Sequence, residues 1–129
     1  YYRFWRTVML DKMDRALLDL IEPFAAMVPP AMVCDKSTYS AFESEQFNNI
    51  LSRHQPDTLI LSGVETDVCV LAAVYGAVDR GYRVIIPSDG VSSWSPAGHR
   101  VMLESVYSRL DKQIEIATVA EIRAAWGRA

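Results

Sequence analysis

The chain has 129 residues, of which 50% are hydrophobic and 22% charged, a composition typical of one globular domain and unlike that of a disordered segment. Its 13 basic and 16 acidic residues give a formal net charge of −3, and no basic run favours a nucleic-acid or anionic membrane partner. The apolar stretches are too short to span a membrane, and two cysteines without a CxxC pair predict neither a disulfide framework nor a zinc site. We therefore expect a cytoplasmic protein that binds neither nucleic acid nor membrane.

The N-terminal part of the sequence predicts two helices and one strand. Apolar residues recur at roughly helical spacing over 13–27, with Pro23 as an interruption. The run 31–34 predicts a short buried strand that ends in a polar loop. Ser40 and Glu43 then have the spacing of a capping box at the start of a second helix.

Beyond this second helix, apolar strands alternate with helices. Three short apolar runs predict strands at 58–61, 82–86 and 113–117. Capping and turn residues predict helices at 67–80, from the Ser95-Pro96 pair onward, and from Thr118, with Glu121, to about Trp126. A sharp turn at 62–66 joins the first of these strands to its helix.

This alternation is typical of an α/β fold with three layers, α-β-α, in which helices cover both faces of a mainly parallel sheet. We expect a single domain over residues 1–129, since no linker, repeat or low-complexity segment divides the sequence. In such sheets the functional residues follow the carboxyl ends of the strands. The segments after Val33 and after Leu61 therefore hold the candidate site residues.

Cys69 is the first candidate, as a nucleophile. With Thr66 or Asp67 as N-cap, it falls in the first turn of a helix, where free backbone N–H groups and the helix dipole favour a thiolate. The backbone amides of Glu65 and Cys69 are the candidate donors to a developing oxyanion. A cysteine in this position is equally consistent with a side chain that only packs.

The other candidates are less specific. Lys36 follows a strand end and can favour a neighbouring thiolate or stabilise a transition-state anion, although most lysines are solvated surface groups. Cys34 lies within an apolar run and is expected to be inert. His99 is a candidate acid or base, but a packed or capping histidine is the simpler interpretation. Three aromatic side chains are candidates either for the walls of a pocket or for the core: Tyr39, Phe42 and Trp94.

Two segments carry a resemblance to a known family. The sequence DTLILSGVETDVCV at residues 57–70 resembles the isochorismatase-like cysteine hydrolases, which include nicotinamidases and N-carbamoylsarcosine amidase. The sequence DKSTYSAF at residues 35–42 is similar to the lysine motif of that superfamily. The resemblance extends over about residues 30–126 and implies the same three-layer fold, with the family's first strands not represented in this chain.

The resemblance also implies a site. The family's catalytic triad consists of aspartate, lysine and cysteine, and Lys36 and Cys69 match two of its members by motif. The third, an aspartate at the end of the family's first strand, has no match in this sequence. A non-proline cis peptide bond is implied between Val64 and Glu65, where it would turn backbone amides toward an oxyanion.

The implied activity is hydrolysis of a C–N bond in a small amide, imide or carbamoyl compound, through a thioester on Cys69. We expect no cofactor and no metal, and the resemblance implies a homo-oligomer. Because the triad aspartate has no match, the alternative is a catalytically incomplete domain that serves as a binding or assembly module. A nucleotide-binding sheet is a third hypothesis, but the single glycine in the turn at 62–66 does not make a phosphate-binding loop.

Overall fold

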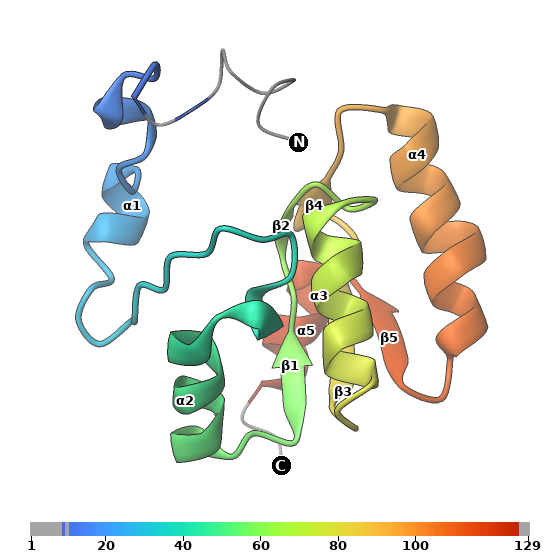
Figure 1. Cartoon of the computed structure of the whole chain (residues 1–129). Coiled ribbons are helices and arrows are strands. Elements are labelled where there is room, and N and C mark those ends of the chain that lie inside the picture. The colour runs from blue at the N-terminus through green and yellow to red at the C-terminus, as the bar shows by residue number, and fades with distance from the viewer. Residues whose placement is uncertain (1–8, 10, 127–129) are drawn as a thin grey trace. The chain divides into compact units, whose positions relative to one another are not determined.

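The computed structural model describes Met9 and residues 11–126 (Figure 1). The chain divides into two compact units, Tyr1–Val33 and Cys34–Ala129, and each is treated by itself. The expectation of a single domain over residues 1–129 stays a prediction.

The first unit holds two short helices in place of the helix expected over 13–27. The 3-10 turn η1 covers Arg15–Leu17, and α1 covers only Glu22–Ala25. Pro23 lies in the first turn of α1, where its missing N–H costs no helical hydrogen bond; the same residue in the middle of a longer helix would break it. The expectation of one interrupted helix was therefore wrong. The strand expected at 31–34 was also wrong, because this run joins neither sheet.

Within the described residues, the second unit contains a parallel sheet of three strands in the order β1-β3-β5. Strand β1 is Thr58–Ile60, β3 is Arg83–Pro87 and β5 is Ile114–Ala117, close to the predicted ranges. A second, smaller parallel pair joins β2 (Gly63–Val64) to β4 (Val91–Ser92). Strand β2 falls inside the predicted turn at 62–66, and its pairing was not expected, since β4 lies far along the sequence.

The helices of the second unit connect these strands. They are the 3-10 turn η2 (Ala41–Glu43), α2 (Glu45–His54), α3 (Cys69–Val78), α4 (Pro96–Val101) with its π and 3-10 continuations η3 (Met102–Val106) and η4 (Tyr107–Leu110), and α5 (Val119–Ala125).

Side-chain caps define four of these helix starts. Ser95 caps α4, and Thr118 with Glu121 forms the complete capping box of α5, as predicted. The capping box expected from Ser40 and Glu43 was wrong: Ser40 caps the single turn η2, and Ser44 caps α2. Both serines precede a hydrogen-bonded turn, and the spacing alone did not distinguish them.

Alternate side chains of β3 face opposite layers, as a parallel sheet covered on both faces requires. Val84 and Ile86 are fully buried in the core that includes Val74 and Ala77 of α3, whereas Ile85 lines the opposite side, which faces α5. In Figure 1, α3 lies in front of the strands and α5 behind them. The three-layer α/β fold is therefore confirmed. No helix in the described part of the chain is long and apolar enough to cross a membrane.

Candidate active site

Cys69 is the first residue of α3, so its place in the first helical turn was predicted correctly, but the expected N-cap of Thr66 or Asp67 was wrong. Its N-cap is Val68, which provides no side-chain hydrogen bond, so backbone N–H groups at this helix end are left without side-chain caps. The Cys69 side chain is half-buried and its thiol is free. Among the described residues, the N–H groups of Glu65 and Cys69 donate to no acceptor.

The turn before Cys69 is held at several points by other segments. Its Val64–Glu65 peptide bond is cis. The Thr66 N–H donates to the Ser92 carbonyl at 2.9 Å, and the Glu65 carbonyl accepts from the N–H groups of Val68 and Val70 at 3.0 Å each. Several backbone groups of the turn are thus hydrogen-bonded, whereas the N–H groups of Glu65 and Cys69 have no acceptor among the described residues.

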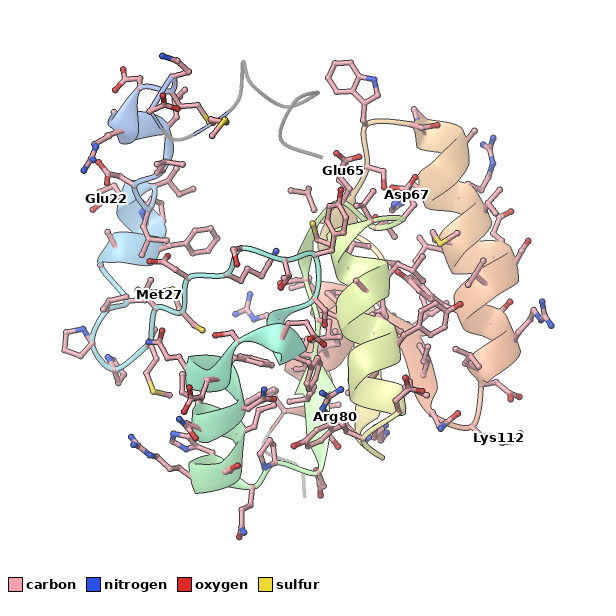
Figure 2. The ribbon with its side chains drawn as sticks, viewed as in Figure 1. Glu22, Met27, Glu65, Asp67, Arg80 and Lys112 are labelled. Carbon is pink, nitrogen blue, oxygen red and sulfur yellow. The ribbon has the colours of Figure 1, made fainter. Side chains whose placement is uncertain are left out.

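Side chains of the turn reach the segment that leads into α4. The Glu65 carboxylate accepts the Trp94 N–H at 3.2 Å, and the Ser93 hydroxyl donates to Asp67 at 2.7 Å. Figure 2 shows Glu65 and Asp67 at the N-terminal end of α3, beside this segment. Both carboxylates therefore have structural partners.

Thr66 is the buried polar residue at the centre of this turn. Its side chain is fully buried, and its Oγ1 lies 2.9 Å from Nδ1 of His99. The Tyr107 hydroxyl donates to the Thr66 carbonyl at 2.5 Å. Burial, and secondarily the charge of Asp67, raises the pKa of Tyr107 well above its ordinary value, so this hydroxyl stays protonated and remains a donor.

A cavity of about 290 Å³ brings Lys36 and Cys69 together. The Lys36 ammonium donates to the Thr38 carbonyl at 2.8 Å and stays accessible. Tyr39 and Phe42, two of the three aromatic residues that were candidates for either a pocket wall or the core, line this cavity, and Phe42 also belongs to the core. The full lining is Lys36, Tyr39, Ala41, Phe42, Phe47, Ile60, Leu61, Ser62, Val64, Cys69, Val70 and Ala73.

Three other sequence candidates lie outside this cavity. Trp94 is 93% exposed and is not among the lining residues. Cys34 is half-buried, and its sulfur lies 3.3 Å from the Ser44 hydroxyl. His99 contacts Thr66, which agrees with the interpretation of a packed histidine more closely than with that of an acid or base in the cavity.

Sequence reasoning missed Tyr107 and gave Thr66 only a capping role. No spacing signal pointed to these contacts, since two residues eight positions apart lie about 80° apart on a regular α-helix and do not share a face. The sequence also did not indicate Thr66 as the shared partner of His99 and Tyr107, because it is 33 and 41 residues away from them.

A larger hollow of about 710 Å³ lies between α5 and the strands β1, β3 and β5. Its walls are mostly apolar, with the exposed ion pair of Arg83 and Glu115 on its surface. No cysteine, histidine or lysine lines it, so the smaller cavity is the one that holds candidate chemistry. Among the described residues, no group of three His, Cys, Asp or Glu side chains is placed to hold a metal ion.

Comparison with known proteins agrees with this fold. An isochorismatase family protein of Bacillus subtilis, PncA, is 30% identical over 86 residues, which are 67% of this chain and 47% of that protein. The crystal structure of an isochorismatase-like hydrolase from Alkaliphilus metalliredigens superposes with a TM-score of 0.63 at 28% identity, over 77% of this chain and 56% of that one. That of nicotinamidase PncA from Bacillus subtilis gives 0.58 at 30% identity, over 64% and 44%.

The chain thus spans about half the length of these relatives. The family match itself is to the isochorismatase domain and covers residues 4–121, which is most of the sequence. The chain belongs to the isochorismatase family.

Proposed function

We propose that this protein is a cysteine hydrolase that cleaves the C–N bond of a small amide, imide or carbamoyl compound. The observation that carries the proposal is the position of Cys69 at the start of α3, in a cavity that it shares with Lys36. A cavity of about 290 Å³ suits a small molecule. The nicotinamidase among its relatives, whose name states an amide substrate, supports the same bond type.

In the proposed first half-reaction, the Cys69 sulfur attacks the carbonyl carbon of the substrate. The carbonyl oxygen becomes an oxyanion, and the unpaired N–H groups of Glu65 and Cys69 are the proposed donors to it. When the C–N bond breaks, the nitrogen leaves as ammonia or an amine and takes the proton that the thiol lost. The acyl group then remains on Cys69 as a thioester.

In the second half-reaction, water attacks the thioester and releases a carboxylic acid, and Cys69 regains its proton. Lys36 is the proposed cation that stabilises negative charge in both steps, since it lines the same cavity. The family resemblance assigns proton transfer to an aspartate that has no match in this sequence.

A second candidate function has an observation of its own in its favour. No aspartate or glutamate lines the cavity of Lys36 and Cys69 within the described part of the chain. A cavity without a carboxylate base fits a noncatalytic binding or assembly module. The two functions differ in whether Cys69 reacts with a carbonyl carbon.

An acyl-transfer experiment separates them. The protein is incubated with p-nitrophenyl acetate, and the mass gain of each cysteine-containing peptide is followed over time. We expect the acetyl group on Cys69 to form much faster than on Cys34, and to be lost in Cys69→Ala but kept in Cys34→Ser. Equal acylation of the two cysteines would contradict the hydrolase and favour the binding module.

A further inference from the structure

We propose that Thr66, His99 and Tyr107 form a positioning network that fixes the turn before Cys69, so that the Glu65 and Cys69 N–H groups face the reacting carbonyl. The inference rests on the proposed role of Cys69 as nucleophile and adds the residues that act on the site without touching the substrate. The three residues are called the Thr66 network below.

Every polar group of Thr66 is occupied by a residue from another segment. Its N–H donates to Ser92 of β4, its carbonyl accepts from Tyr107, and its hydroxyl contacts His99. The side chain is fully buried, so breaking any of these contacts would leave an unsatisfied group away from water. Thr66 therefore has one arrangement in which all its polar groups are satisfied.

The position of Thr66 in the chain gives this arrangement a consequence for the site. It directly follows Glu65 and precedes Cys69 by three residues, so it is the fixed point between the two unpaired N–H groups. Donors that are already oriented need no reorganisation when charge develops on the carbonyl oxygen, and this lowers the barrier. Neither His99 nor Tyr107 lines the cavity, so their effect would be transmitted through Thr66.

The helix that carries His99 and Tyr107 has an irregularity in a suitable place. Eight residues make about 2.2 turns of an α-helix, which would turn the two side chains about 80° apart. Between them, Met102–Val106 forms a π-helical segment, whose wider i→i+5 turns reduce that angle. Such segments are frequent at functional sites, and here it allows both side chains to reach Thr66.

Two rates on Cys69 distinguish positioning from simple structural support. Acylation by p-nitrophenyl acetate passes through an oxyanion, whereas alkylation by iodoacetamide attacks an sp³ carbon and forms none. A network that positions the oxyanion donors affects acylation alone. A network that only stabilises the fold changes both rates together.

We expect Thr66→Val and Tyr107→Phe each to slow Cys69 acylation by about tenfold, which is the effect of one hydrogen bond of ordinary strength. Alkylation of Cys69 should change less than about twofold, since none of the removed groups touches the sulfur in the structure. His99→Ala should act like Thr66→Val. His99→Asn should restore most of the acylation rate, because its amide can place a polar atom near the position of Nδ1.

The chain offers matched controls. His54→Ala removes a histidine at the end of α2, and Tyr82→Phe removes the hydroxyl of a half-buried tyrosine directly before β3; neither side chain contacts Thr66, His99 or Tyr107. Both rates should stay at their original values in these variants. Tyr107→Phe keeps the aromatic ring, so it tests the network even where Thr66→Val fails to fold.

Two results would overturn the proposal, and neither is confused with failure of the proposed function. Unchanged acylation in the Thr66, His99 and Tyr107 variants, with fast acylation of Cys69 in the original protein, refutes the network alone. An equal fall of acylation and alkylation shows a structural role only and also refutes it. If Cys69 of the original protein is acylated no faster than Cys34, the proposed function fails first and the network has no reaction to support.

Discussion

Replacing Gly76 by alanine tests the packing that shapes the candidate cavity. Gly76 lies on α3 against Phe42, and a Cβ at this position would be 2.6 Å from Cδ2 and 3.1 Å from Cγ of that ring. Carbon atoms do not approach this closely, so the ring or the helix must shift. The ring has little room, because Phe47 packs edge-on at 5.2 Å and the Arg80 guanidinium lies 4.8 Å from its centroid.

Two effects of opposite sign set the expected free energy of unfolding. Alanine in place of glycine in a helix interior is favourable by about 1 kcal/mol. Insertion of a methyl group into a filled core costs roughly 1–3 kcal/mol. Since Phe42 is only 2% exposed, we expect the packing cost to dominate and Gly76→Ala to destabilise the protein by up to about 2 kcal/mol.

Urea unfolding measures this difference. With a slope of about 1–3 kcal/mol per molar urea, each 1 kcal/mol moves the midpoint by roughly 0.3–1 M. The same substitution in a Phe42→Leu background should become neutral or stabilising, because the ring that the methyl group meets is gone. A midpoint that rises in both backgrounds would refute the close contact between α3 and Phe42.

The remaining predictions concern single groups. Hydrogen bonds from the Thr118 backbone and hydroxyl lower the pKa of Glu121 in the folded protein, so its contribution to stability is complete above its ordinary pKa and is lost as the pH falls through the lower folded value. Thermal unfolding over acidic pH should therefore show a difference between the original protein and Glu121→Gln that shrinks toward low pH, and a constant difference would contradict this. In an alkaline ultraviolet titration, Tyr107 should ionise only when the protein unfolds, because burial raises its pKa. This late ionisation step should be absent in Tyr107→Phe. A late step that persists in the variant would belong to another tyrosine and contradict the prediction. Lys36→Met should slow acylation of Cys69 more than it weakens binding of an unreactive amide, whereas an effect on binding alone would limit Lys36 to substrate recognition.

The fold could be predicted from the sequence where the signal is local. The strands at 58–60, 83–87 and 114–117 are apolar runs between turn residues, and the caps Ser95 and Thr118 act within three residues of themselves. The strand expected at 31–34 was wrong, because an apolar run shows a preference for extended backbone but does not provide the neighbouring strand that a ladder requires. The pair of β2 and β4 was missed for the converse reason, since two residues on each side leave no periodic pattern.

The candidate site, like the fold, has some features that a local sequence pattern predicts and others that depend on residues far apart in the chain. Cys69 was placed at a helix start by its neighbours in sequence. Lys36 was singled out because it follows the run 31–34, but this run is no strand, so that reason was wrong although Lys36 does line the cavity of Cys69. The contacts of Thr66 with His99 and Tyr107 join residues 33 and 41 positions apart, and no local spacing predicts them. The sequence also did not reveal that Trp94 is exposed, because an aromatic side chain at this position is as consistent with a pocket wall as with the surface.

The central claim is that Cys69 cleaves a C–N bond with an acyl group left on its sulfur. A single-turnover experiment with a primary amide, such as nicotinamide, in which released ammonia and the mass of the Cys69 peptide are measured in the same samples, tests this directly. With the carboxylic acid product measured as well, the account predicts that the ammonia released equals the acyl group on Cys69 plus the acid already formed from it, and that all three vanish in Cys69→Ala. Ammonia released equally by Cys69→Ala, or an acyl group found on another residue and not on Cys69, would contradict it.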